Sequence, residues 1–124
     1  MRVQIVYCGV LPQSDPTKRR IPAMRMLMQL DLPVEKFNAA VRDGTVGAKI
    51  QSILEDAQPE AAYFTERDGR RGGVVIVDVA SPSDIPRLAE PWFLHFDARV
   101  EFRICMTPDD LAKAGLAELG VKWG

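Results

Sequence analysis

The stretch that decides the fold is Met24-Arg-Met-Leu-Met-Gln-Leu-Asp-Leu32, in which two kinds of position alternate. Every even-numbered position is Met or Leu, whereas the odd-numbered positions are Arg25, Leu27, Gln29 and Asp31. Side chains of a β-strand point to opposite faces in turn, so this pattern predicts a strand with one face on a core. Pro33 ends the strand, because proline has no N–H to donate to a neighbouring strand.

The next segments alternate between helical and extended patterns. Residues 34–56 are predicted to be helical, with a break near Asp43-Gly44-Thr45 because glycine disfavours a helix interior. Residues 60–67 and 72–79 are predicted strands, and the Asp68-Gly69 pair between them is a strong hairpin signal. The second of these strands is almost continuously apolar, which is typical of a central strand covered on both faces.

The last third of the chain shows two similar helix starts. In Ser81-Pro-Ser-Asp84 we expect Ser81 to cap a helix and Pro82 to take its first position, with Pro91 stopping or bending it. Residues 99–106 alternate again and are a predicted strand. Thr107-Pro-Asp-Asp110 repeats the combination of cap and proline and opens a short C-terminal helix.

The element order is therefore strand, helix, strand, strand, helix, strand. Together with short connections and right-handed crossovers, this order predicts an α+β fold of the ferredoxin-like βαββαβ kind. Its four-stranded antiparallel sheet has the order 4-1-3-2 with both helices on one face. We expect the domain at residues 24–106, an N-terminal extension at 1–23 that is strand-like and then a linker, and a C-terminal helix and tail at 107–124.

The composition excludes several classes of protein. The chain has 124 residues and a formal net charge of −1, so nothing draws it as a whole to nucleic acid or an anionic membrane. One histidine and two cysteines, Cys8 and Cys105, do not provide an ordinary zinc site. Two separate thiols favour a reducing cytosol, with a disulfide between them as the alternative. No apolar run reaches the roughly 20 residues that cross a bilayer. We expect a cytoplasmic protein with no cofactor, metal, nucleic-acid partner or membrane partner.

The sheet face away from the helices mixes apolar and charged side chains. It is expected to carry Leu27, Tyr63, Val74 and Ile76 together with Arg25, Gln29, Thr65, Asp78, Glu101 and Arg103. An apolar patch of this kind usually marks an interface. We therefore expect a homodimer in which two such faces meet and enclose the polar side chains in a shared cavity.

A resemblance supports this arrangement. Asn38-Ala-Ala-Val-Arg-Asp-Gly44, Pro59-Glu-Ala-Ala-Tyr-Phe64, Ala89-Glu-Pro-Trp-Phe93 and Met106-Thr-Pro-Asp-Asp-Leu-Ala112 resemble small uncharacterised bacterial members of the dimeric α/β-barrel superfamily. The resemblance implies the fold and the dimer. That superfamily includes muconolactone isomerases, cofactor-independent monooxygenases and haem-handling enzymes, and none of their catalytic residues maps onto a position here.

The candidate site residues lie mainly on the uncovered face. Gln29, Asp31, Glu101 and Arg103 are expected to cluster across two adjacent strands, with Tyr63 and Thr65 nearby. Arg103 would bind a carboxylate or carbonyl ligand, and Asp31 or Glu101 would act as a base if burial raised its pKa. The alternative is a salt-bridge ladder at the dimer seam. Arg25 and Asp78 form a second expected pair, which fits a structural ion pair.

Other candidates have simpler alternatives. His95, in an aromatic loop, could serve as a general acid-base or a haem ligand, or be a packed side chain. Cys105 could be a nucleophile or an inert thiol. Arg67, Arg70 and Arg71 at the hairpin tip, and Lys18-Arg-Arg20, could contact phosphate or be solvated. RNA binding is disfavoured because the third strand lacks the aromatic side chains on which bases stack.

The sequence predicts a homodimeric domain that binds a small molecule. If it is catalytic, the expected class is a cofactor-free isomerase or monooxygenase on a small organic substrate. The alternative function is a non-catalytic structural or regulatory dimerisation domain.

Overall fold

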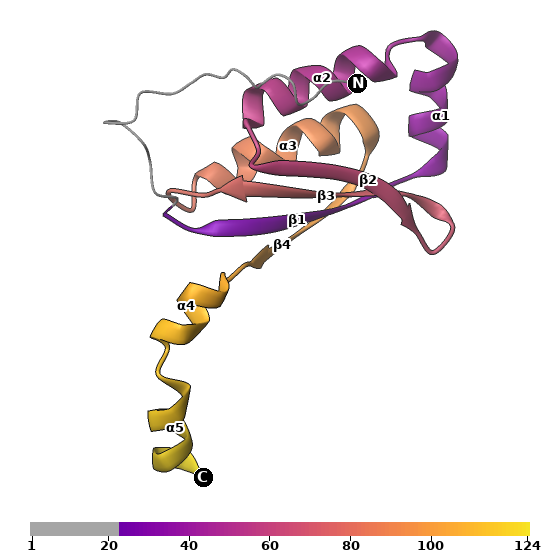
Figure 1. Ribbon diagram of the computed structural model, residues 1–124. Coiled ribbons are helices and arrows are strands. Elements are labelled where there is room, and N and C mark those ends of the chain that lie inside the picture. The colour runs from indigo at the N-terminus through magenta and orange to yellow at the C-terminus, as the bar shows by residue number, and fades with distance from the viewer. Residues whose placement is uncertain (1–22) are drawn as a thin grey trace.

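The computed structural model describes residues 23–124, and the predicted strand and linker of the N-terminal extension fall outside them, as do Cys8 and Lys18-Arg-Arg20. The described chain contains four strands and five helices (Figure 1). In chain order these are β1 (Arg25–Leu32), α1 (Val34–Asp43), α2 (Val46–Ala57), β2 (Ala61–Arg67), β3 (Arg70–Asp78), α3 (Asp84–Phe96), β4 (Arg99–Ile104), α4 (Pro108–Lys113) and α5 (Leu116–Trp123).

The strands form one antiparallel sheet, so the α+β class predicted from the sequence is confirmed. The strand order is β2-β3-β1-β4, and the same sheet read from its other edge runs β4-β1-β3-β2. Helices α1, α2 and α3 lie together over one face of this sheet (Figure 1). The other face, called here the open face, carries no helix of this layer.

The alternation along β1 determines which residues form the core. Met28, Leu30 and Leu32 are no more than 1% exposed and face the helices. Val75 and Val77 of β3 join them, together with the helix residues Leu88, Trp92 and Phe96. The odd-numbered positions of β1 therefore lie on the open face, where they are only half-buried.

β3 is covered less completely than its composition predicts. Val75 and Val77 are buried, but Val74 and Ile76, which point to the open face, are half-buried. A single copy of the chain thus leaves one face of its most apolar strand partly in water, so the prediction that both faces are covered is wrong for one copy.

Two glycine-containing turns behave as the sequence predicts. Gly44 has a φ of 81° and its N–H bonds back to α1, which separates α1 from α2 at the expected break. Asp68 and Gly69 both have positive φ, at 53° and 78°, and join β2 to β3 as a two-residue hairpin loop. The hairpin is tighter than expected, because β3 begins at Arg70 rather than at Gly72.

Helix α3 corrects two expectations. It begins at Asp84 rather than at Pro82, because the Asp84 carboxylate accepts N–H groups of Ala80 and Ser81 and holds the preceding residues as a turn. Ser81 does not cap the helix, since its hydroxyl bonds that of Ser83. Pro91 does not end the helix, which continues to Phe96 because residues on both sides of the proline are buried in the core.

The last residues leave the body of the molecule. Thr107 caps α4 as predicted, and Gly115, with a φ of 73°, separates α4 from α5. No side chain of either helix is buried. Residues 107–124, called here the C-terminal arm, project from the end of β4 on the side of the sheet away from α1, α2 and α3 (Figure 1).

Candidate functional site

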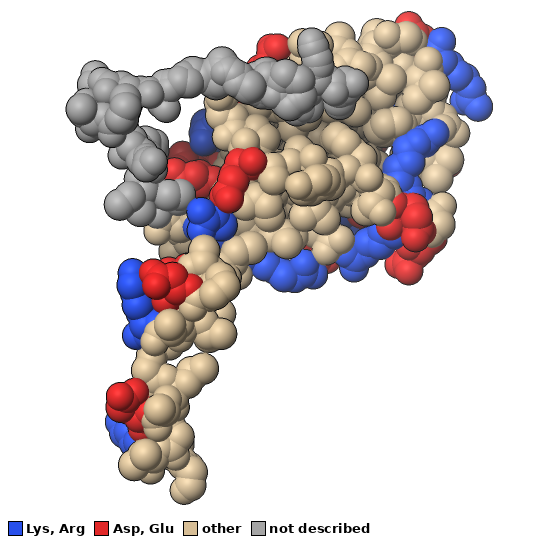
Figure 2. Space-filling view, viewed as in Figure 1, with Lys and Arg blue, Asp and Glu red and all other residues tan. Residues whose placement is uncertain are grey.

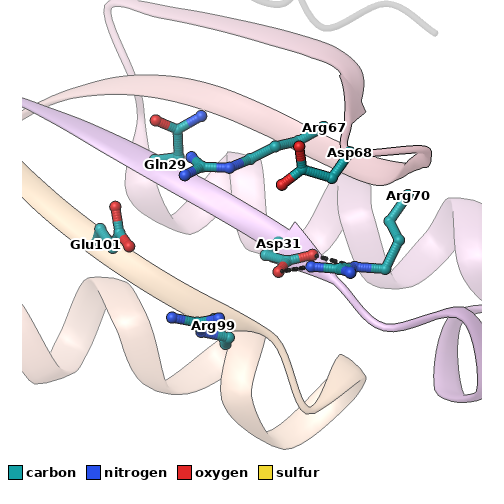
Figure 3. A pocket seen from close by; sticks show the side chains of 7 residues that line it. All are labelled: Gln29, Asp31, Arg67, Asp68, Arg70, Arg99 and Glu101. Carbon is teal, nitrogen blue, oxygen red and sulfur yellow. Dashed lines mark hydrogen bonds and ion pairs between the residues drawn. The ribbon is translucent and has the colours of Figure 1, made fainter.

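A polar cleft lies on the open face at the end of the sheet where β1, β4 and the β2–β3 hairpin meet. Its volume is about 70 Å³. Seven side chains line it, and all but Gln29 are charged: Gln29, Asp31, Arg67, Asp68, Arg70, Arg99 and Glu101 (Figure 3).

Strand register places these side chains together. Asp31 of β1 is opposite Arg99 of β4, and Gln29 is opposite Glu101. On the other side of β1, Asp31 is opposite Gly72 of β3, which has no side chain to fill the space. Arg67 of β2 and Arg70 of β3 form the last residue pair of the hairpin, and both line the cleft on its β2–β3 side.

The strongest contact in the cleft joins Asp31 and Arg70. Arg70 donates from Nε to Asp31 Oδ1 at 3.1 Å and from Nη2 to Oδ2 at 2.6 Å (Figure 3). The hydrogen bonds from Arg70 hold the pKa of Asp31 below its ordinary value, and the charges of Arg70, Arg99 and Arg67 act in the same direction. Asp31 is therefore poorly suited to be a general base, because the hydrogen bonds from Arg70 outweigh the effect of burial, which by itself would raise the pKa of Asp31.

Two guanidinium groups in the cleft have no such partner. Within residues 23–124, neither Arg67 nor Arg99 forms an ion pair with a carboxylate. Both residues line the cleft, and both lie near enough to Asp31 to lower its pKa. Guanidinium groups bind carboxylate and phosphate oxygens through paired hydrogen bonds, which makes this end of the sheet suitable for an anion.

The cluster predicted around Arg103 is present beside the cleft. Arg103 donates from Nη1 to Gln29 Oε1 at 2.9 Å and from Nη2 to Glu101 Oε1 at 3.1 Å. Arg103 and Glu101 are both about half-exposed, at 53% and 47% of their side-chain area. In a single copy this group is a cross-strand ladder, and Arg103 is already occupied by its neighbours.

Other predicted site residues lie apart from the cleft. Tyr63 points to the open face from the edge strand β2 and is 67% exposed. Thr65 lines a different hollow. Arg25 and Asp78 are opposite each other in the register as expected, but the Arg25 guanidinium binds Glu60, with its Nε 2.6 Å from Glu60 Oε1.

His95 and Cys105 also lie elsewhere. His95 is in the last turn of α3, on the other face of the sheet, and not in a loop; its ring lies beside that of Phe96 with centroids 6.1 Å apart. Cys105 follows the last residue of β4 and is a half-buried free thiol.

Sequence reasoning missed four residues of the cleft: Arg67, Asp68, Arg70 and Arg99. For Arg67 and Arg70 the sequence left open a phosphate contact or a solvated hairpin tip, and for Asp68 it indicated only the turn, whereas the hairpin places all three at the cleft with Arg70 bound to Asp31. Arg99 was detectable in principle, since it lies two residues before Glu101 and so shares its strand face.

A second hollow lies on the helix side, at the edge of the sheet. It has a volume of about 310 Å³ and is lined by Leu32, Phe37, Ile50, Phe64, Thr65, Arg71 and Gly72. The Arg71 guanidinium lies 4.5 Å from the centre of the Phe37 ring. The other side chains are mainly apolar, so this hollow offers no set of converging polar groups.

Similarity to known proteins does not assign a role to the cleft. No protein-family model matches the chain, and no curated protein matches it. Among residues 23–124, no group of three or more His, Cys, Asp and Glu side chains is placed to hold a metal ion. No helix of this part of the chain is both long and apolar enough to span a bilayer.

Proposed function

We propose that this chain is a small-molecule-binding domain that holds an anionic ligand, of the carboxylate class, in the polar cleft. The observation that carries the proposal is the pair Arg67 and Arg99, two arginines that line the cleft without an ion-pair partner in residues 23–124. Arg70 is already neutralised by Asp31, so the ligand would bind between the other two arginines.

We further propose that the working unit is a homodimer formed through the open face. The cleft of one copy holds about 70 Å³, room for a few waters at roughly 30 Å³ each. Sites for small organic molecules usually begin near roughly 300 Å³. A second sheet over the open face would enlarge and enclose the cleft, and would also cover Val74, Ile76 and the exposed ring of Tyr63.

The fold type fits this assembly. A four-stranded antiparallel sheet with helices on one face supports a ferredoxin-like domain of the dimeric α/β-barrel type, the superfamily that the chain resembles. In its catalytic form the proposal is a cofactor-free isomerase or monooxygenase. Asp31 is then a weak proton acceptor, because the hydrogen bonds from Arg70 lower its pKa.

The ligand proposal is tested by titrating small carboxylates, benzoate and succinate, into the full-length protein in a calorimeter. We expect Arg67→Gln and Arg99→Gln each to weaken binding by about tenfold or more, the loss expected for one charge-assisted contact. Arg42→Gln is the matched control, since it removes the same charge from the exposed end of α1 and should leave affinity unchanged. Equal losses in all three variants, or no binding by the wild-type protein, would refute the ligand proposal.

The alternative function is a structural or regulatory dimerisation domain. The exposed Tyr63 and the half-buried Leu27, Val74 and Ile76 support it as well as they support a ligand-binding dimer. A dimer in sedimentation that binds no carboxylate would favour this alternative. A monomer at micromolar concentration would contradict both functions.

A further inference from the structure

The C-terminal arm is a built structure rather than a loose tail. Thr107 Oγ1 accepts the N–H of Asp110 at 3.0 Å, and Asp110 Oδ2 accepts the N–H of Thr107 at 2.9 Å. This reciprocal cap, with Pro108 in the first helical turn, fixes where α4 begins. A left-handed Gly115 then fixes where α5 begins. The arm thus has a defined shape although it buries no side chain.

Apolar side chains are concentrated on the arm and at its base. Of the fourteen large hydrophobic residues that are exposed in residues 23–124, seven lie in the last 21 residues. These seven are Ile104, Met106, Leu111, Leu116, Leu119, Val121 and Trp123, which are between 42% and 88% exposed. Together they expose on the order of several hundred Å², which is the size of a patch that usually binds something.

Most of the apolar side chains of α5 share one stripe. Leu116, Leu119 and Trp123 follow the spacing i, i+3, i+7 of an amphipathic helix that docks against another surface. Val121 lies on the opposite side of α5, since each residue turns the helix by about 100°. In Figure 2 the charged side chains of the arm lie along one side of it and the other side is uncharged.

We infer that the arm docks on a second copy of this chain, which returns the contact with its own arm. This inference rests on the proposed homodimer. The arm leaves β4 on the side of the open face, so a second sheet placed over that face would lie beside it (Figure 1). The docking surface is thereby continuous with the proposed interface.

The size of the surface also favours a second copy. A stable interface buries roughly 800 Å² of polar and apolar surface on each partner, and the apolar residues of β1 and β3 on the open face are already half-buried in one copy. In a symmetric dimer the arm contact occurs twice, because each copy docks its own arm on its partner. The exchanged arms would therefore add their exposed apolar side chains to the surface that the two sheet faces bury.

Sedimentation of full-length variants over a range of protein concentrations tests the inference. Leu119→Ser, on the stripe, should raise the dissociation constant of the dimer by about tenfold or more. Val121→Ser removes an apolar side chain of similar kind from the other side of α5 and should change it less than about twofold. Neither residue packs in the core, so far-UV circular dichroism should be unchanged in both. Equal effects of the two substitutions would overturn the inference.

Iodide quenching of tryptophan fluorescence separates this inference from the proposed dimer. Trp92 is 1% exposed and Trp123 is 75% exposed, so iodide reports mainly on Trp123. We expect quenching to fall several-fold as the protein dimerises. A dimer in which Trp123 stays quenchable would overturn the arm contact and leave the open-face dimer standing. A monomer at every concentration would overturn both, and protection of Trp123 in that monomer would mean that the arm folds onto its own body.

Discussion

Replacing Leu30 with alanine tests whether β1 has one core face and one open face. Leu30 is fully buried, between Gln29 and Asp31 of the cleft. The substitution removes apolar groups worth about 2 kcal/mol in transfer free energy, at roughly 0.8 kcal/mol for each buried CH₂. The cavity left behind adds to this, so the free energy of unfolding should fall by about 3 kcal/mol.

The assay is equilibrium unfolding in urea, with Leu94→Ala as the matched control. Leu94 is in α3 but 71% exposed, so the same chemical change should alter the free energy of unfolding by less than about 0.5 kcal/mol. The slope of the unfolding free energy against urea should stay constant in both variants. If Leu30→Ala and Leu94→Ala destabilise the protein equally, the assignment of even-numbered β1 residues to the core is wrong.

Three further predictions concern single side chains. Asp31 has a lowered pKa because Arg70 binds its charged form. Its contribution to stability is therefore present above its unfolded pKa of about 3.9 and is lost as the pH falls through the folded value. The difference in urea midpoint between wild type and Asp31→Asn should disappear in acid, and a difference that persists there would contradict the pairing. Gly72→Ala should destabilise the protein by about 1–3 kcal/mol in thermal unfolding, because the added Cβ would lie 2.9 Å from the Leu30 carbonyl oxygen. Gly47→Ala is the control: a Cβ at Gly47 would have no neighbour within 4 Å, so this substitution should be neutral or stabilising. Thr107→Ala removes the cap of α4 and should reduce helical ellipticity, at a cost of about 1 kcal/mol to that helix; unchanged ellipticity would show that the cap is not needed.

The strands and their faces could be predicted from the sequence because alternation is local information. The alternation of side chains along β1 and β4 was enough to predict that Gln29 lies beside Glu101 and Arg103. The structure confirms this contact, since Arg103 donates hydrogen bonds to both Gln29 and Glu101. The Asp-Gly pair was enough for the hairpin, because few residues adopt positive φ at both turn positions.

The parts that the sequence did not predict depend on long-range packing. Pro91 carries a local signal to end a helix, but Trp92 and Phe96 are each buried in the core and hold the segment helical past the proline. Arg70 and Asp31 are 39 residues apart, and only the full register of β1 and β3 shows that the hairpin tip reaches the cleft. The same limit explains why the sequence could not decide between a phosphate contact and a solvated turn for Arg67 and Arg70.

The alternation of β1 also bears on how the lining of the cleft can change. Because Gln29 and Asp31 line the cleft and even-numbered residues build the core, a substitution at Gln29 or Asp31 changes the cleft without repacking the core behind it. The same alternation makes the strand sensitive to a change in length. Inserting one residue between Leu30 and Asp31 would turn Asp31 to the core face and Leu32 to the open face, placing a carboxylate where leucine belongs. We therefore expect β1 to tolerate substitutions on its open face better than insertions.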